Sequence, residues 1–145
     1  MRKPPAADGF ANGSCLCGAV RFSIELPPRW VAHCHCSVCR RAHGAGFVTW
    51  VGVGKASFSL LSGREQLAVY KSSRRAIRSF CQRCGSTLLF ESEHWANEIH
   101  VTLANLEPKP GLEPQAHAYW SSRAPWAVFG AGGLKTLNPP DYTAD

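Results

Sequence analysis

The sequence predicts a mainly β fold, a small antiparallel β-sheet domain with few short helices, and three observations support this class. Short segments alternate apolar and polar residues, Gly and Pro separate these segments, and helical periodicity is poor throughout. The 145 residues suit a single domain with one core. Roughly seven short strands between turns are typical of an all-β domain.

The predicted strands occupy most of the chain. Val20, Phe22, Ile24 and Leu26 alternate with polar residues and share one face of the first strand, which the sequence LPPRW ends. The other strand segments are residues 46–53, 56–63 (ending in a turn), 65–72, 74–81, 86–92, 98–106 and 114–120. We expect 65–72 and 74–81 to form a hairpin around Ser72–Ser73. One short helix is predicted at CSVCRRAH, residues 36–43, with Ser37 as its cap.

The domain boundaries follow from composition. Residues 1–12 are rich in Ala, Pro and Gly without periodicity, so we expect a flexible tail there. Residues 13–130 hold the predicted strands and all seven cysteines, and they form the expected domain. Residues 131–145 read as an irregular C-terminal tail.

Charge and hydropathy exclude some functions. The net charge of +6 is read as a solvated basic surface, and no recognition motif for specific nucleic-acid binding appears. No apolar run approaches the ~20 residues that span a bilayer, so no membrane association is predicted. The basic N-terminus lacks the apolar segment of a signal peptide, which favours a cytoplasmic protein.

The seven cysteines are grouped, which is typical of metal or redox chemistry rather than of disulfides in a chain without a secretory signal. Two of the groups end in glycine: CLCG holds Cys15 and Cys17, and CQRCG holds Cys81 and Cys84. We expect Cys15 and Cys17 to share one face of a strand, and Gly85 to close the second turn with a positive φ. Four thiolates make a closed, structural zinc site, although four cysteines can also hold an iron–sulfur cluster.

The third group, AHCHCSVC, supplies Cys34, Cys36 and Cys39 and no fourth cysteine. Three protein ligands with an open fourth position are typical of catalytic zinc. Two alternatives stay open at this stage. One of the neighbouring histidines can complete a closed site, or CSVC can act as a metal-free redox pair. The histidines concerned are His33, His35 and His43.

In combination, the cysteine motifs resemble the glutathione-dependent formaldehyde-activating enzyme (GFA) family. The resemblance rests on GSCLCGAVRF, AHCHCSVCRRAHGAGF and SFCQRCGSTLLF in that order, then on HVTLANL and PQAHAYWSSRAPW, over roughly residues 13 to 129. It implies a zinc-binding antiparallel β fold with two zinc ions per chain. By resemblance, Cys15, Cys17, Cys81 and Cys84 form the structural site, and Cys34, Cys36 and Cys39 form the site linked to activity.

The family resemblance also implies an activity. Family members are named for joining formaldehyde to glutathione as S-hydroxymethylglutathione, a carbon–sulfur lyase reaction in reverse. The expected partners are therefore a small-molecule thiol such as glutathione, and formaldehyde. The alternative is a non-catalytic zinc-binding β module that binds a thiol, a protein or nucleic acid. After Trp126 the sequence AVFGAGGLKTLNPP departs from the acidic, Pro-containing ending that the resemblance leads us to expect.

Other residues follow from the chemistry of glutathione. His35 and His43 are the candidate catalytic proton carriers. Because glutathione carries carboxylates, cations are expected around it, and Arg40 is the first candidate for substrate binding. The further arginines considered are Arg41, Arg64, Arg74, Arg75 and Arg78, and Trp50, Trp95 and Trp126 are candidate pocket walls, with His117 of interest through the family pattern.

Overall fold

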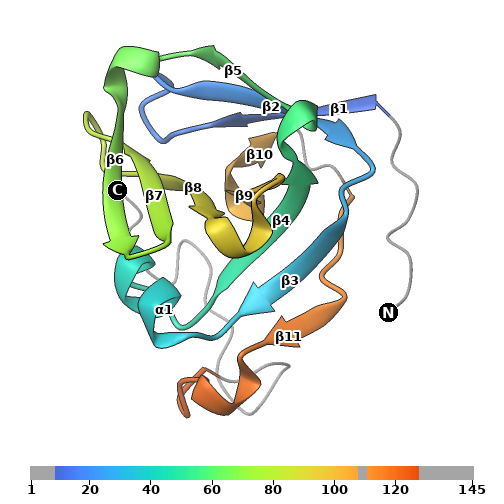
Figure 1. Cartoon of the computed structure of the whole chain (residues 1–145), viewed down its shortest axis with the longest axis vertical. Helices are drawn as coiled ribbons and strands as arrows, with labels where there is room; N and C mark the ends of the chain where they lie inside the picture. The colour runs from blue at the N-terminus through green and yellow to red at the C-terminus, as the bar shows by residue number, and fades with distance from the viewer. Residues whose placement is uncertain (1–8, 108–110, 128–145) are drawn as a thin grey trace, which may run out of the picture.

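The structure is a computed structural model that describes residues 9–107 and 111–127, and it consists of two β-sheets with one α-helix (Figure 1). The four-stranded sheet has the order β10-β1-β2-β5, and the seven-stranded sheet has the order β11-β3-β4-β9-β8-β7-β6. The strands are β1 Gly9–Ser14, β2 Arg21–Leu26, β3 Trp30–Cys34, β4 Val48–Gly54, β5 Phe58–Ser62, β6 Leu67–Ser73, β7 Ala76–Cys81, β8 Thr87–Ser92, β9 Glu98–Thr102, β10 Leu106–Glu107 and β11 Ala116–Ala118.

Nearly all strand pairs are antiparallel, which confirms the predicted fold class. The exception in the described part of the chain is β11, which pairs in parallel with β3 through Ala116 opposite Ala32 and Ala118 opposite Cys34. Helix α1, Ser37–His43, follows β3 directly. Short 3₁₀ turns complete the described elements: Lys55–Ser57, Arg64–Gln66, Glu93–Trp95, Leu103–Asn105 and Trp120–Ser122. None of the described helices is long and apolar enough to cross a membrane.

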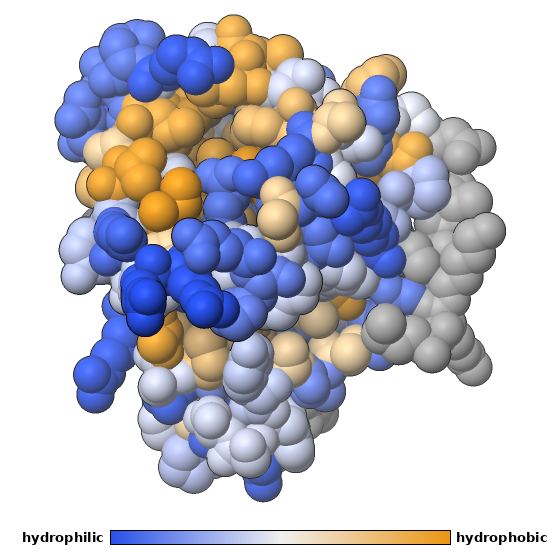
Figure 2. All heavy atoms as spheres, in the orientation of Figure 1, coloured by the Kyte–Doolittle hydropathy of each residue, from blue (hydrophilic) through white to orange (hydrophobic). Residues whose placement is uncertain are grey.

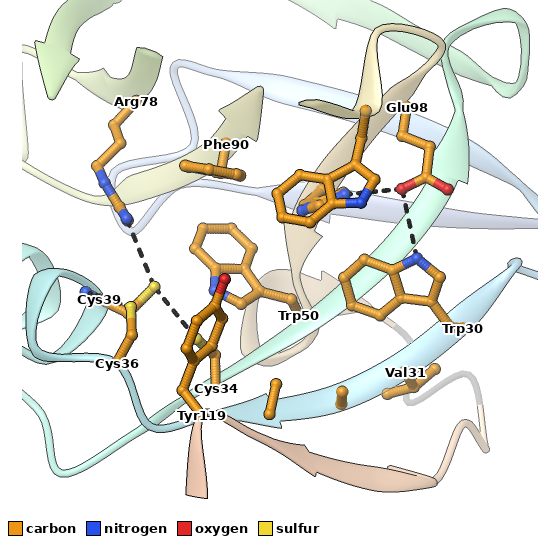
Figure 3. Close-up of a pocket in the computed structure, with 14 residues that line it drawn as sticks. Trp30, Val31, Cys34, Cys36, Cys39, Trp50, Arg78, Phe90, Glu98 and Tyr119 are labelled. Atoms are coloured by element: carbon orange, nitrogen blue, oxygen red, sulfur yellow. Dashed lines mark hydrogen bonds and ion pairs between the residues drawn. The ribbon is translucent and has the colours of Figure 1, made fainter. Parts of the chain in front are cut away.

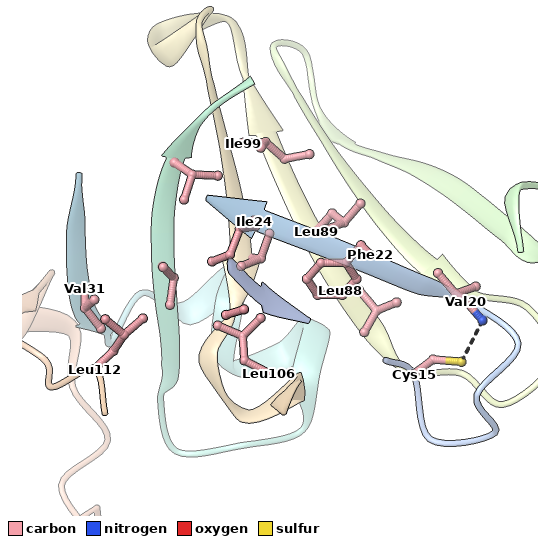
Figure 4. Close-up of a cluster of buried hydrophobic side chains, with 14 of the residues drawn as sticks. Cys15, Val20, Phe22, Ile24, Val31, Leu88, Leu89, Ile99, Leu106 and Leu112 are labelled. Carbon is pink, nitrogen blue, oxygen red and sulfur yellow. Dashed lines mark hydrogen bonds between the residues drawn. The ribbon is translucent and has the colours of Figure 1, made fainter. Parts of the chain in front are cut away.

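The main core lies between the two sheets (Figure 4). Val20, Phe22 and Ile24 are fully buried on one face of the chain segment that the alternation predicted. From the facing sheet, Leu88 and Val101 are buried against them. Each such side chain contributes about 1.5–3 kcal/mol by leaving water. The apolar pattern therefore fixes how the two sheets face each other.

Strand β1 occupies residues that the sequence assigned to a tail, so the boundary at residue 12 is corrected: ordered structure begins by Gly9. Ala11 is buried, and a Cβ on Gly13 would lie on the ring of Phe22. The inward positions of β1 are thus small because Phe22 fills the space above them. A strand with small inward residues carries no apolar alternation, which explains the error. The expected 131–145 tail lies outside the described residues.

Several other elements sharpen the prediction. The hairpin between β6 and β7 turns at Arg74–Arg75 rather than at Ser72–Ser73. Strand β3 begins at Trp30, where the sequence predicted no strand but only the end of the preceding one, followed by the cysteine group. Helix α1 forms as predicted, but its cap is Cys36 rather than Ser37, because the Sγ of Cys36 accepts a hydrogen bond from the Cys39 amide at 3.3 Å.

On the face drawn in Figure 2, hydrophobic side chains gather toward the end that β5 and β6 occupy in Figure 1, and hydrophilic residues cover the centre. Leu61, Val69 and Tyr70 are among the exposed apolar residues of these two strands. One cysteine group lies close to this end, since Cys81 pairs with Leu67 of β6, and the other lies beside α1.

Candidate metal centres and pocket

Four cysteines meet where a loop of each sheet comes together. Cys15 and Cys17 lie in the turn between β1 and β2, and Cys81 and Cys84 lie where β7 ends and turns toward β8. All four sulfurs lie within 4.8 Å of one another. Cys15 and Cys17 are in a turn rather than on a strand as expected, yet their sulfurs are 3.6 Å apart. The cluster therefore joins the four-stranded sheet to the seven-stranded sheet.

The backbone of both turns follows the same plan. Gly18 and Gly85 have φ of +79° and +80°, and their amides donate to the carbonyls of Cys15 and Cys81 at 3.1 and 2.7 Å. Glycine adopts this left-handed conformation without a steric penalty. Each turn can therefore close tightly and bring its two cysteine sulfurs together. The hydroxyl of Ser86 hydrogen-bonds the sulfur of Cys84 and lowers the pKa of that thiol to about 5.

The second cluster comes from one short segment. Cys34 ends β3, Cys36 caps α1, and Cys39 lies in the first turn of that helix. The three sulfurs lie within 4.8 Å of one another, and Cys34 and Cys39 are 3.5 Å apart. The thiols of Cys34 and Cys39 lower the pKa of Cys36, while Cys36 and Cys39 raise that of Cys34. The cluster thus favours negative charge on Cys36.

Both donor sets fit a thiophilic metal ion. A tetrahedral ion with metal–sulfur bonds of ~2.3 Å places its ligands about 3.8 Å apart. The measured separations of 3.6 Å (Cys15 to Cys17), 3.9 Å (Cys17 to Cys81) and 3.5 Å (Cys34 to Cys39) are close to this value. The first set supplies four ligands and the second supplies three. No histidine of the described residues joins either set of closely spaced ligand atoms.

The three-cysteine cluster opens into a pocket of about 500 Å³, whereas the four-cysteine cluster does not line it (Figure 3). The strand order β3-β4-β9-β8-β7 brings the walls together from five neighbouring strands. The lining residues are Trp30, Val31, Ala32, Cys34, Cys36, Cys39, Trp50, Arg78, Phe90, Trp95, Glu98, His100, Ala118 and Tyr119.

Arg78 lies beside the sulfurs at one side of the pocket. Its Nη2 is 3.5 Å from the Sγ of Cys39, and its guanidinium carbon lies 4.9 Å from the centre of the Phe90 ring. The side chain is buried, and its Nε and Nη1 have no hydrogen-bond partner among the described residues. A cation here offsets the charge of the thiolates and keeps N–H groups available to an oxygen of a ligand.

Glu98 of β9 lies with Trp30 at the other side of the pocket, with Trp50 and Phe90 between them and the cysteines (Figure 3), and His100 of the same strand contacts both Glu98 and Trp30. The Nε2 of His100 is 2.9 Å from Oε2 of Glu98, and the Nε1 of Trp30 donates to the same oxygen at 3.4 Å. Burial lowers the pKa of His100. This end of the pocket therefore carries a carboxylate whose partners are already in place.

The histidines predicted from the sequence lie away from the pocket lining. Successive residues of a strand face opposite sides, so His33 of β3 points away from Cys34, and neither His33 nor His35 lines the pocket. The Nε2 of His35 is 2.9 Å from Nδ1 of His117, and Nδ1 of His33 is 2.8 Å from the hydroxyl of Thr49. His43 packs against Trp50, and burial, with the charge of Arg78, lowers its pKa to about 4.

Arg40 also lies outside the lining, with its Nη2 donating to the carbonyl of Ser122 at 3.1 Å and its Nε to that of His35 at 3.4 Å. Of the candidate wall residues, Trp50 and Trp95 line the pocket, while Trp126 is exposed beside Gly46.

Sequence reasoning missed Trp30, Phe90, Glu98, His100 and Tyr119 as pocket residues. For Trp30 a signal existed: it shares strand parity with Ala32 and Cys34, and all three line the pocket.

The fold and these sites define a class: a β-sheet protein with two cysteine clusters able to hold metal ions, one closed by four sulfurs and one opening into a pocket. The chain belongs to the glutathione-dependent formaldehyde-activating enzyme family, which matches residues 10–122.

The relatives agree with this assignment. A Halomonas elongata protein named as a putative glutathione-dependent formaldehyde-activating enzyme is 29% identical over 122 residues, 79% of this chain and 78% of its own. An uncharacterised lyase of Schizosaccharomyces pombe is 35% identical over 90 residues, 62% of this chain and 64% of its own. A crystal structure of a Rhodobacter sphaeroides protein matches with a TM-score of 0.61 at 28% identity, covering 74% of this chain and 99% of that one. The names of the family and of the first two relatives support an enzyme with a role related to glutathione and formaldehyde, and the crystal structure supports the fold.

Proposed function

We propose that this chain is a zinc-dependent carbon–sulfur lyase-type enzyme that binds a thiol such as glutathione and acts on its formaldehyde adduct, S-hydroxymethylglutathione. The observation that carries the proposal is that the sulfurs of Cys34, Cys36 and Cys39 line a pocket large enough for a small molecule. Three ligands facing a pocket are the arrangement of a catalytic rather than a structural metal site.

Zinc, with two ions per chain, is the metal we propose. Thiolate donors at tetrahedral spacing suit zinc, and iron is the competing metal that direct metal analysis distinguishes. Cys15, Cys17, Cys81 and Cys84 would hold the structural ion, and Cys34, Cys36 and Cys39 would hold the second. Zinc bound by three thiolates supplies a site that keeps an added thiol in its thiolate form.

The adduct-forming reaction needs a sulfur nucleophile, a carbonyl carbon and a proton for the carbonyl oxygen. The sulfur–carbon bond forms, the π electrons of the carbonyl move to oxygen, and that oxygen takes up a proton; the lyase direction reverses each change. The unpaired N–H groups of Arg78 can donate to this oxygen, and the aromatic walls exclude water.

His35 and His43 were the proton carriers suggested by the sequence, and neither lines the pocket. His100 does line it, with Glu98 as its partner, but at the side away from the cysteines, so we assign proton transfer at the adduct oxygen to none of these imidazoles and keep Arg78 as the group beside that oxygen. Arg78 takes the substrate-binding role that the sequence suggested for Arg40.

A cytoplasmic location is part of the proposal. None of the seven cysteines is in a disulfide, and a reducing compartment keeps their thiols available to metal.

The test titrates glutathione and other thiols into zinc-loaded protein and measures formaldehyde consumption in parallel. We expect thiol binding at one site per chain and turnover that Cys36→Ser abolishes, with the Cys36→Ser protein still folded. Absence of any thiol binding would refute the proposal. Binding without turnover would instead favour a non-catalytic zinc-binding β module.

A further inference from the structure

The walls of the pocket are chiefly aromatic. Trp30, Trp50, Phe90, Trp95 and Tyr119 all line it. The four rings other than that of Tyr119 form a continuous surface through His100. The ring centre of His100 is 4.6 Å from that of Trp30 and 5.5 Å from those of Phe90 and Trp95, and the ring centres of Trp50 and Phe90 are 6.0 Å apart. Such a surface gains most from an apolar ligand, above all one with a ring or a branched chain.

The pocket has few charged side chains, and they lie at opposite ends of it. Among the described lining residues, Arg78 is the cation and Glu98 is the carboxylate. Arg78 lies against the cysteine sulfurs, while Glu98 lies at the other side beside Trp30. The pocket thus offers one anion-binding group, next to the metal ligands, and at the far end a carboxylate that already pairs with Arg29 at 3.4 Å and lies 2.9 Å from the Nε2 of His100.

Glutathione fits this arrangement poorly. It carries two carboxylates and one ammonium group, all several bonds away from its sulfur. With the sulfur at the cysteines, its charged ends would reach the aromatic walls and the side of Glu98. A carboxylate there would lose its water without gaining a cation, and the ammonium group would meet a Glu98 carboxylate that Arg29 and His100 already hold.

An adduct with an apolar body fits better. An oxygen one carbon away from a ligand sulfur bound near Cys39 would lie beside Arg78, because the Nη2 of Arg78 is 3.5 Å from the Sγ of Cys39 and its Nε and Nη1 lack described partners. The remainder of the molecule would then lie along Phe90, Trp95 and Trp30. The buried guanidinium and the apolar walls therefore match the two parts of one small molecule.

We propose, resting on the function proposed above, that the substrate of this site is the aldehyde adduct of a small thiol with an aromatic or branched apolar body. In this assignment Arg78 binds the oxygen of the adduct, and Trp30, Phe90 and Trp95 select the apolar body over glutathione.

Calorimetric titration of the zinc-loaded full chain with benzyl mercaptan and with glutathione tests the selectivity. We expect benzyl mercaptan to bind at least about tenfold more tightly, from the apolar area that its ring buries. Trp95→Ala should weaken the affinity for benzyl mercaptan by about tenfold and change the affinity for glutathione little. Trp95 is partly exposed, so its loss should leave the fold and the zinc content intact.

Trp126→Ala is the matched control, because Trp126 is an exposed tryptophan outside the lining. It should leave both affinities unchanged. If glutathione binds as tightly as benzyl mercaptan or more tightly, the apolar substrate class is refuted and the proposed enzyme stands. If neither thiol binds, both proposals fail. If Trp95→Ala and Trp126→Ala have equal effects, the selecting role of Trp95 is refuted.

Discussion

The two cysteine clusters use the same donor atoms in opposite ways. The four-cysteine cluster draws Cys15 and Cys17 from one sheet and Cys81 and Cys84 from the other, so a metal bound there links segments more than 60 residues apart. The three-cysteine cluster comes from residues 34–39 alone and opens into the pocket. A metal that links distant segments contributes to folding, whereas a metal held by one segment can be lost with little effect on the rest.

The sharpest way to break this comparison is Cys81→Ser, which removes a fully buried ligand of the linking cluster. Structural zinc contributes on the order of 10 kcal/mol, which is comparable to the whole stability of a domain. We therefore expect the variant to lose one zinc and to lack a cooperative thermal transition by circular dichroism. A native-like transition would show that the cluster is not structural.

Cys36→Ser is the matched change in the pocket cluster. Serine keeps the hydrogen bond that caps α1, so the substitution removes a metal ligand without removing the cap. We expect the variant to hold one zinc fewer by native mass spectrometry and to turn over thiol at a rate reduced by about 100-fold or more. Its thermal unfolding midpoint should stay within a few degrees of that of the wild type. Equal unfolding of the Cys36 and Cys81 variants would refute the division into structural and open sites.

Arg78→Met tests whether the pocket cluster needs a neighbouring cation. Methionine keeps much of the volume but removes the charge and the N–H groups. Because a hydrogen bond to a charged group contributes about 1.5–3 kcal/mol, thiol-adduct binding should weaken by roughly 10- to 100-fold. Arg78→Lys should recover part of the affinity, measured by calorimetry at full zinc occupancy. A variant that binds as wild type does would remove Arg78 from the site.

His43 offers the smallest effect, in the pH dependence of stability. Its pKa in the folded protein is lowered from 6.5 to about 4, by burial first and then by the charge of Arg78. Between these values the unfolded chain binds a proton that the folded chain does not, so stability falls as pH drops from 6.5 toward 4.

A His43→Gln variant cannot take up this proton and should lose less stability over the same interval. Thermal midpoints at pH 7.5 and pH 5 in both proteins measure the difference, which cancels acid effects on the zinc ligands that the two proteins share. Parallel losses in both proteins would show that His43 is not the group responsible.

The sequence predicted the β fold and the two cysteine groups because both depend on local order: apolar alternation for Phe22 and Ile24, and close spacing for Cys81 and Cys84. It could not place Glu98 or His100 in the pocket, because strand order in the sheet brings them near β3, and local patterns do not encode strand order. The sequence ranked Arg40 above Arg78 for the same reason: Arg40 follows the metal loop in sequence, whereas Arg78 reaches the loop only in space.

Tyr119 is, among the described residues, the one non-glycine residue with a positive φ, 54°, and its side chain lines the pocket. The left-handed conformation costs an ordinary residue roughly 1–2 kcal/mol. Glycine would relieve the backbone but would leave that wall of the pocket missing. The fold therefore keeps Tyr119 in a backbone conformation that lowers its stability, and in return the side chain of Tyr119 is available to contact a ligand in the pocket.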